Sequence, residues 1–352
     1  MHAGRYAPSP TGQLHLGNLR TALLAWLFAR HTERTFLLRI EDLDRVRAGA
    51  EAQQLRELEA IGLNWDAEPV RQSERIDLYE HALDVLRERG LVYECFCSRK
   101  DIAEATSAPH PTQSPASSAQ LPDDGPSPHS AGRLLLPPGS YPGTCRNLSE
   151  SERERRRRDR PAALRIDAAR AAGTDGAPAH QVTDVLHGTV RAAVDDFVLR
   201  RNDGAFAYNL AVVVDDLTQG VDQVVRGDDL LSSAPRQDWL AGVLWEAGAI
   251  EVPGEAQDRP VTEYAHVPLV LNTEGKRLAK RDGAVTLEDL GVLDGLDGPD
   301  SPDTEPAPWT ADRVRTVLLE SVGLPGESLD AALDAFAPDR LPRTPWIFTG
   351  LD

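Results

Sequence analysis

Residues 4–18, GRYAPSPTGQLHLGN, decide the fold of this chain. Positions 4–9 predict a short strand that runs into a proline- and glycine-rich loop. A helix with one apolar face is predicted next, from the helical spacing of Leu19, Leu23, Trp26, Leu27 and Arg30. Because a helix N-terminus presents free N–H groups and a partial positive charge, this arrangement predicts a phosphate-binding site where the helix begins.

Two residues at the start of that helix suit a nucleotide. Gly17 removes a side chain where a nucleotide can lie against the backbone. His15 is placed to donate a hydrogen bond to a phosphate as negative charge builds up in a transition state. The alternative is a turn with an incidental histidine, which a His-x-Gly sequence by itself would favour.

The segments that follow predict a parallel α/β sheet. Residues 36–40 have the pattern of a buried strand and lead into the acidic cluster Glu41, Asp42 and Asp44, and amphipathic helices are expected at 49–61 and 74–89. The pattern resumes in the second half of the chain. There we expect a hairpin over 197–208, a helix or strand over 209–215 and a strand over 223–226.

The domain organisation follows from where this pattern breaks. We expect a catalytic domain over 1–290, an inserted subdomain over 93–190, and a short C-terminal tail over 291–352 with a helix at 313–322. Residues 106–132 are rich in Pro, Ser, Ala and Gly, which predicts a flexible insert. The helix expected over 149–160 is either an RNA-binding face or a solvated helix with paired Arg and Glu, and we favour the second.

Composition limits the class of protein. The 352 residues carry a net charge of −18, which by itself argues against nucleic-acid binding, although a local basic face is sufficient for it. The longest apolar run, over 21–29, is too short to span a bilayer, and we find no signal peptide. We therefore expect a cytoplasmic protein without a membrane partner, and a monomer.

A second glycine-flanked loop, over 275–283, contains the cations Lys276, Arg277, Lys280 and Arg281. It follows a strand-like run over 267–271. Cations on such a loop can clamp the β- and γ-phosphates of a nucleotide during attack at the α-phosphate. The alternative is an exposed basic turn.

Together, the two loops resemble the signature pair of class I aminoacyl-tRNA synthetases. Residues 5–12, 39–44 and 277–281 resemble the glutamyl/glutaminyl branch, and residues 206–216 and 225–230 extend the match. The resemblance covers 4–285 apart from the insert. It implies a Rossmann-type parallel sheet and a reaction in which glutamate attacks the α-phosphate of ATP, giving glutamyl-adenylate for transfer to RNA.

The resemblance also implies roles for individual residues. Glu41 suits the ammonium group of glutamate, whereas Arg5 and Arg226 suit carboxylates. The implied glutamate-binding residues are Arg5, Tyr6, Ala7, Pro8, Ser9, Glu41, Tyr208 and Arg226, and the implied residues for ATP, which enters with magnesium, are His15, Gly17, Asn18 and Lys280, with His15 and Lys280 as catalytic residues. One position departs from the family: Ala279 stands where the family has serine, which removes a hydroxyl contact to ATP or within the loop.

The three cysteines form a candidate zinc site. Cys95, Cys97 and Cys145 give one thiolate fewer than a tetrahedral site needs, and free buried cysteine is the alternative. A truncated group within the family, the glutamyl-Q tRNA(Asp) synthetases, carries Cys-x-Cys followed by Tyr-x-x-x-Cys, which Tyr141 and Cys145 match. This resemblance implies Tyr141 as the fourth ligand, with His110, His129 or water as replacements.

The RNA acceptor is suggested by the end of the chain. Only 72 residues follow Lys280, with few basic and aromatic side chains, so we expect no anticodon-binding domain. The resemblance then implies activation of glutamate without tRNA and transfer to queuosine at the wobble position of tRNA(Asp). The alternatives are a truncated synthetase that charges tRNA(Glu), a non-catalytic paralogue that binds tRNA or glutamate, and another nucleotidyltransferase with the His-x-Gly loop.

Overall fold

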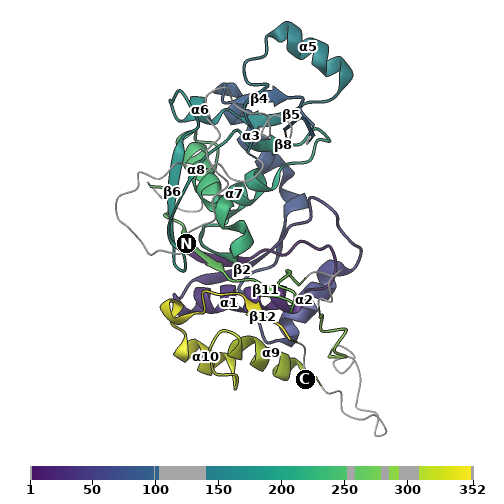
Figure 1. Ribbon diagram of the computed structural model, residues 1–352, viewed down its shortest axis with the longest axis vertical. Helices are drawn as coiled ribbons and strands as arrows, with labels where there is room; N and C mark the ends of the chain where they lie inside the picture. The colour runs from purple at the N-terminus through teal and green to yellow at the C-terminus, as the bar shows by residue number, and fades with distance from the viewer. Residues whose placement is uncertain are drawn as a thin grey trace.

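A seven-stranded sheet forms the centre of the structure (Figure 1). The computed structural model describes residues 2–98, 100–102, 140–251, 258–278, 285–292 and 309–349. In spatial order the strands are β3 (Val70–Arg71), β2 (Thr35–Ile40), β1 (Ala3–Tyr6), β9 (Val221–Gly227), β10 (Glu263–Val267), β6 (Ala179–Asp184) and β7 (Gly188–Ala193). All neighbouring pairs are parallel except β6 and β7, which confirms the mostly parallel sheet.

Strand β1 lies at the point where the strand order of the sheet changes direction. Arg5 on β1 is in register with Leu37 of β2 on one side and with Val224 of β9 on the other. The strand order changes direction here, because the chain passes from β1 to β2 on one side and reaches β9, on the other side, only in its second half. In parallel α/β sheets, ligands bind beyond the carboxyl ends of the strands at such a point.

Helices cover the sheet with two apolar cores. One core joins α1 (Leu16–His31) to α9 (Ala311–Glu320) and α10 (Leu329–Ala335), which lie together below β2 in Figure 1. The second joins α3 (Ile76–Glu88), α7 (Tyr208–Thr218) and α8 (Ala234–Glu246). Shorter elements complete these layers: α2 (Ala50–Ala60), the 3-10 helices η1 (Gln72–Arg75), η2 (Asp228–Ser233) and η3 (Pro338–Arg340), and the parallel pair β11 (Val270–Leu271) and β12 (Trp346–Ile347).

A smaller antiparallel sheet lies at the opposite end of the molecule from α9 and α10 (Figure 1). Its strands are β4 (Val92–Cys95), β5 (Ala163–Ile166) and β8 (Val198–Arg200), with α6 (Ala168–Ala171) after β5. Helix α5 (Glu150–Asp159) projects from this end and has no buried residue. Within the described ranges, no helix has both the length and the apolar character needed to cross a membrane.

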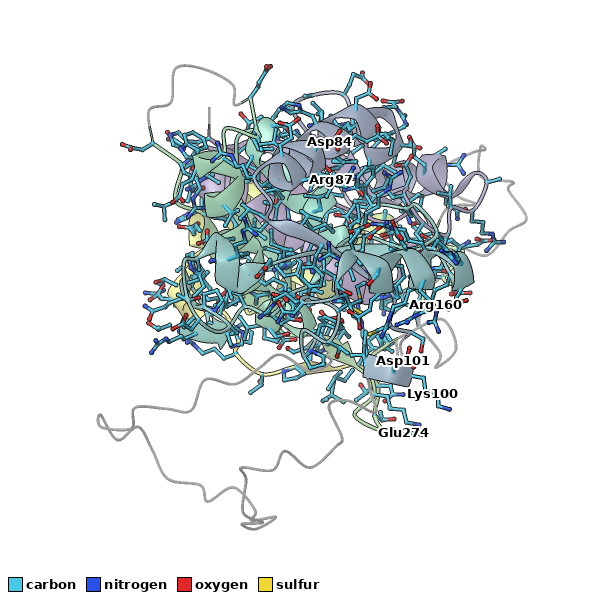
Figure 2. The ribbon with its side chains drawn as sticks, turned by 90° about the horizontal axis from the view of Figure 1, so that it is seen from above. Asp84, Arg87, Lys100, Asp101, Arg160 and Glu274 are labelled. Atoms are coloured by element: carbon cyan, nitrogen blue, oxygen red, sulfur yellow. The ribbon has the colours of Figure 1, made fainter. Side chains whose placement is uncertain are left out.

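The ion pairs of α5 follow the interpretation that we favoured. Arg157 contacts Glu150 at 2.7 Å and Glu94 at 2.6 Å, and Arg153 also contacts Glu150, at 3.7 Å. Figure 2 shows Arg160, just after the helix, beside Asp101, and these two side chains are 3.7 Å apart. Some of the arginines of α5 are therefore paired with nearby acidic side chains.

Most expected elements are present, but some differ and others were not predicted. The strand-like run over 267–271 is divided between the end of β10 and β11. The hairpin over 197–208 has a single strand, β8, because only Phe206 bridges back to Arg200 before α7 begins at Tyr208. The β6–β7 hairpin, α8 and α10 were not predicted. The insert over 106–132 lies outside the described residues.

Gly4 sets the spacing between the sheet and α1. A Cβ atom at this position would lie 3.0 Å from Ala29 Cβ and 2.9 Å from Gln223 Oε1. We expect Gly4→Ala to lower the free energy of unfolding by about 1–3 kcal/mol, because a buried overlap forces neighbouring groups apart. Urea denaturation measures this change. Gly242→Ala in α8, where an added Cβ meets nothing within 4 Å, is the matched control and should be neutral or stabilising; equal effects of the two substitutions would contradict the close packing.

Candidate functional site

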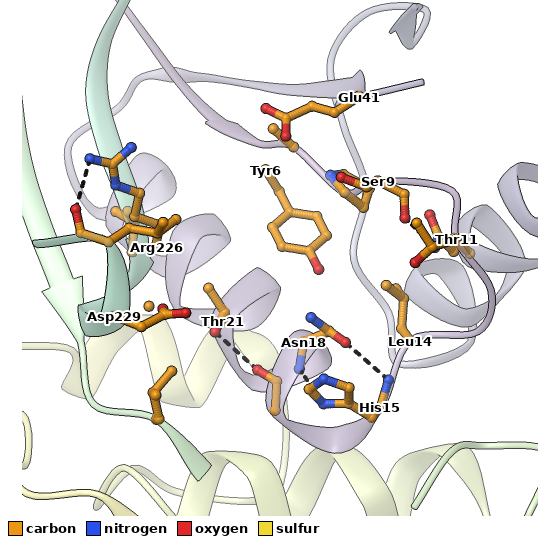
Figure 3. A pocket seen from close by; sticks show the side chains of 18 of the residues that line it. Tyr6, Ser9, Thr11, Leu14, His15, Asn18, Thr21, Glu41, Arg226 and Asp229 are labelled. Atoms are coloured by element: carbon orange, nitrogen blue, oxygen red, sulfur yellow. Dashed lines mark hydrogen bonds between the residues drawn. The ribbon is translucent and has the colours of Figure 1, made fainter. Parts of the chain in front are cut away.

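A cavity of about 550 Å³ opens at the carboxyl ends of β1, β2 and β9 (Figure 3). Its walls include the described residues that the sequence predicted for an amino acid and a nucleotide: Arg5, Tyr6, Ala7, Pro8, Ser9, His15, Gly17, Asn18, Glu41, Tyr208 and Arg226. Residues from five separate segments therefore meet at one site. Lys280 and Ala279 lie outside the described residues.

The beginning of α1 forms one side of the cavity. His15 is the N-cap: its Nδ1 accepts a hydrogen bond from the Asn18 backbone N–H at 3.3 Å, and Asn18 Oδ1 accepts one from the His15 N–H at 3.3 Å (Figure 3). With Nδ1 acting as an acceptor, a neutral ring carries its proton on Nε2 and can donate it to an anion. Asn18 thus orients the histidine and completes the reciprocal pair of bonds that caps the helix.

Gly17 has a structural role that the sequence did not suggest. A Cβ at this position would lie 3.0 Å from Cε1 of the His15 ring and 3.1 Å from its Nδ1. Room for a nucleotide was the expected reason for glycine here. The geometry shows that room for the imidazole is a further reason, because a side chain at position 17 would force the capping ring to shift by a few tenths of an ångström.

A buried charge network holds the opposite side. Asp216 on α7 accepts hydrogen bonds at the same oxygen, Oδ1, from Arg5 Nε at 3.2 Å and from Arg39 Nη1 at 2.7 Å. Arg39 is fully buried, and its Nη2 lies 3.8 Å from Glu41 Oε1. Although burial disfavours its charge, Arg39 and Arg5 hold the pKa of Asp216 below its ordinary value. Asp216 therefore connects both Arg5 and, through Arg39, Glu41 to the core.

The pKa of Glu41 in this network lies close to neutral pH. Burial raises the pKa of its carboxyl to about 7, although Arg39 and Arg5 act in the opposite direction. The negative charges of Asp216 and Asp215 add to the upward shift. A cationic group placed against Glu41 would stabilise the carboxylate and lower this pKa.

Arg226 supplies the remaining cation. It is 6% exposed, and its Nη1 donates to Gln237 Oε1 at 2.7 Å and reaches the Tyr208 hydroxyl at 3.5 Å. Its Nε donates to His266 Nε2 at 2.9 Å. In the described part of the chain, no carboxylate forms an ion pair with Arg226, so its charge is available to an anionic ligand.

The cysteines form a second candidate site, near the small sheet. The sulfur atoms of Cys95, Cys97 and Cys145 all lie within 4.8 Å of one another, and Cys97 and Cys145 are 3.6 Å apart. Sulfurs bound tetrahedrally to zinc at about 2.3 Å would be about 3.8 Å apart. The Tyr141 hydroxyl lies 3.6 Å from Cys97 Sγ. The arrangement can therefore hold a metal ion.

Burial affects the protonation of this cluster in its metal-free form. It raises the pKa of the Cys97 thiol to about 12 and that of Tyr141 well above its usual range. For Cys145, burial acts in the same direction, but hydrogen bonds, first from Tyr141, bring its pKa below the ordinary value. A metal ion would favour the deprotonated forms of all these groups.

Comparison with known proteins identifies the family. The family described as "tRNA synthetases class I (E and Q), catalytic domain" matches residues 3–302. A glutamyl-Q tRNA(Asp) synthetase from Nocardia farcinica is 52% identical over 348 residues, covering 99% of this chain and 93% of that protein. The chain belongs to the glutamyl-Q tRNA(Asp) synthetase family. A member of this family from Cutibacterium acnes is 48% identical over 292 residues, or 82% of this chain and 70% of that protein.

Solved structures of glutamate-tRNA synthetases have a similar fold. The glutamate-tRNA synthetase from Elizabethkingia anophelis has a TM-score of 0.66 and 26% identity, with 99% of this chain and 68% of that chain covered. A glutamate tRNA ligase from Elizabethkingia meningosepticum in complex with its amino acid gives 0.65 and 26%, covering 99% and 67% of the two chains. The described residues of this chain therefore share the fold of these synthetases.

The sequence did not reveal the residues that support the site. Asp216 and Arg39 belong to motifs that were quoted only for their resemblance to the family, and Gln237 and His266 were not singled out. A signal was present for Asp216, because adjacent acids at 215 and 216 end a strongly apolar run. Gln237 and His266 reach Arg226 from 11 and 40 residues away, so no local pattern marks them.

The raised pKa of Glu41 predicts how the stability of the protein depends on pH. The folded protein holds this proton more tightly than the unfolded chain, so ionisation of Glu41 lowers stability as pH rises from about 4.5 to about 7. Glu41→Gln removes that penalty. We expect its melting temperature to exceed that of the wild type by a margin that grows between pH 5 and about pH 7 and then levels off.

Differential scanning calorimetry across this pH range measures the effect. Glu154→Gln on the exposed face of α5 is a control for the loss of one carboxylate elsewhere. Parallel stability profiles for Glu41→Gln and the wild type would contradict the raised pKa.

Proposed function

We propose that this chain uses ATP to activate glutamate as glutamyl-adenylate without RNA, and then transfers glutamate to queuosine at the wobble position of tRNA(Asp). One observation carries the proposal: a single cavity holds both a set of charges that matches glutamate and the capped beginning of α1. The names of the curated relatives support the acceptor.

The charges of the cavity match those of glutamate, which has one ammonium group and two carboxylates. Glu41 is assigned to the ammonium group, which would hold the Glu41 carboxylate ionised. Arg5 and Arg226 are assigned to carboxylates, since a guanidinium can form a bidentate pair. Ser9 and Tyr208 offer neutral hydrogen bonds, and Tyr6, Ala7 and Pro8 shape the wall between them.

In the activation step, a carboxylate oxygen of glutamate attacks the α-phosphorus of ATP. The bond from that phosphorus to the bridging oxygen breaks, and pyrophosphate leaves. His15 Nε2–H and Lys280 are assigned to stabilise the negative charge on the phosphates. Magnesium, which enters with ATP as part of the substrate, neutralises further phosphate charge. In the transfer step, the acceptor nucleophile attacks the acyl carbon and AMP leaves.

We also propose that Cys95, Cys97, Tyr141 and Cys145 hold a structural zinc ion. The distances between the three sulfurs support this assignment. A zinc ion would connect the end of β4 to the segment that contains Tyr141 and Cys145. Its contribution would be to folding, because these residues lie outside the activation cavity.

The acceptor is tested by incubating the full chain with ATP, magnesium and labelled glutamate. The RNA is tRNA(Asp) with queuosine, tRNA(Asp) with guanosine at the wobble base, or tRNA(Glu). We expect label on the queuosine form alone. Label on tRNA(Glu) would favour a truncated synthetase that charges that tRNA, and absence of glutamyl-adenylate would favour a non-catalytic paralogue.

The cation loop provides a matched pair of variants. We expect Lys280→Ala to lower glutamate-dependent pyrophosphate exchange by about 100-fold or more, because a charge on the phosphates is lost in the transition state. Lys276→Ala is the control, since Lys276 pairs with Glu274 at 2.9 Å on the surface. Near-normal exchange by Lys280→Ala would contradict the assignment, whereas Lys276→Ala should keep its activity.

The zinc site is tested by metal content. The wild type should contain one zinc ion per chain by mass spectrometry, and Cys145→Ser should contain none. Tyr141→Phe should bind zinc more weakly than the wild type in competition with a chelator, because one of the four ligands is lost. Tyr93→Phe is the control, because the Tyr93 hydroxyl contacts Asp196 at 2.6 Å. Equal zinc affinity of Tyr141→Phe and the wild type would remove Tyr141 from the ligand set.

A further inference from the structure

Two buried residues, His266 and Asp184, position Arg226, and neither of them lines the cavity. Its Nε donates to His266 Nε2 at 2.9 Å, and His266 Nδ1 lies 2.6 Å from Asp184 Oδ2. His266 is 0% exposed and Asp184 is 1% exposed. The three side chains come from neighbouring strands, β9, β10 and β6, so the sheet itself sets their spacing.

The hydrogen bonds fix the tautomer of His266. An arginine in a protein does not give up its proton, so Arg226 Nε–H must be the donor and His266 Nε2 the acceptor. The ring proton is therefore on Nδ1 and is donated to Asp184. Burial and the charge of Arg226 keep the pKa of His266 below its ordinary value, although Asp184 acts in the opposite direction. The ring is neutral at physiological pH.

Asp184 is itself immobilised. Its Oδ1 accepts from the backbone N–H groups of Leu186 at 2.9 Å and His187 at 3.0 Å, and its Oδ2 accepts from the His266 N–H at 3.0 Å. These bonds, together with Arg226, fix both the position and the plane of the imidazole.

A neutral acceptor behind Arg226 has a specific consequence. A carboxylate in the place of His266 would orient the guanidinium but would also neutralise its charge. The imidazole orients Nε, Gln237 orients Nη1, and both acceptors are uncharged, so the positive charge stays available for a ligand. Arg5 differs, because it shares Asp216 with Arg39.

We propose that Asp184 and His266 are positioning residues for substrate recognition: Asp184 locks His266 as the Nδ1–H tautomer, and His266 then holds Arg226 oriented and uncompensated for a ligand carboxylate. This inference rests on the proposed function for the identity of the ligand. The geometry of the relay is a property of the protein without ligand. If Asp184 and His266 had a purely structural role, their substitution would change the KM for glutamate and the KM for ATP to a similar extent.

The first measurement is 15N NMR of the histidine rings and arginine Nε–H groups in the full chain without substrate. We expect His266 to give the signature of a neutral ring protonated on Nδ1, with Nε2 as acceptor. We also expect the Arg226 Nε–H signal to shift in His266→Leu and to stay close to its wild-type position in His266→Gln, whose amide oxygen can accept the same bond. A ring protonated on Nε2, or an Arg226 signal that ignores both substitutions, would overturn the relay.

The second measurement is the kinetics of glutamate-dependent pyrophosphate exchange. We expect His266→Leu to raise the KM for glutamate by about 10- to 100-fold with the KM for ATP unchanged, as for a lost hydrogen bond to a charged group. His266→Gln should restore most of this loss. His187→Gln is the matched control, because the His187 ring contacts the backbone carbonyl of His266 at 3.0 Å, whereas its bond to Asp184 comes from the backbone N–H, which glutamine keeps.

The two measurements separate failure of the inference from failure of the proposed function. An equal rise in both KM values, or no rescue by glutamine, would reduce the pair to a structural contact and overturn the inference. A wild type without glutamate-dependent exchange would refute the proposed function, and the NMR result would then decide the relay alone.

Discussion

The candidate site depends on one oxygen atom, Oδ1 of Asp216, which accepts hydrogen bonds from both Arg5 and Arg39. These arginines lie on β1 and β2, while Asp216 lies on α7, so the contact joins two neighbouring strands of the sheet to that helix. Arg39 is fully buried, and Asp215 and Asp216, together with Glu41, compensate its charge. Loss of one partner in such a buried pair costs about 3–5 kcal/mol, so this network constrains the fold as well as the cavity.

The same network explains why the cavity is prepared for a ligand. Two cations, Arg5 and Arg226, face it, and Glu41 holds its proton near neutrality because burial and nearby acids outweigh the arginines. A ligand with an ammonium group and two carboxylates would pair with both arginines and would also stabilise the ionised form of Glu41. Preorganisation of this kind lowers the cost of binding, since the side chains are already fixed by Asp216, Gln237 and His266.

The sequence predicted what is encoded locally. The loop and helix of 4–18, the acid after β2 and the arginine at the end of β9 each follow from a short pattern, and the sheet brings them together as expected. The supporting residues could not be found this way, because Asp184 and His266 are 82 positions apart and meet only through strand order. Gly17 shows the same limit: its need for glycine depends on the position of the His15 ring, which no spacing rule gives.

The central claim is that the site is complete in the protein alone. Glutamate-dependent exchange of labelled pyrophosphate into ATP, measured with the full chain in ribonuclease-treated reactions, tests it most directly. We expect exchange with glutamate that does not increase when tRNA is added, and little exchange with glutamine, whose neutral amide cannot pair with a guanidinium as a carboxylate does. Exchange that requires tRNA, or equal rates with glutamine and glutamate, would contradict it.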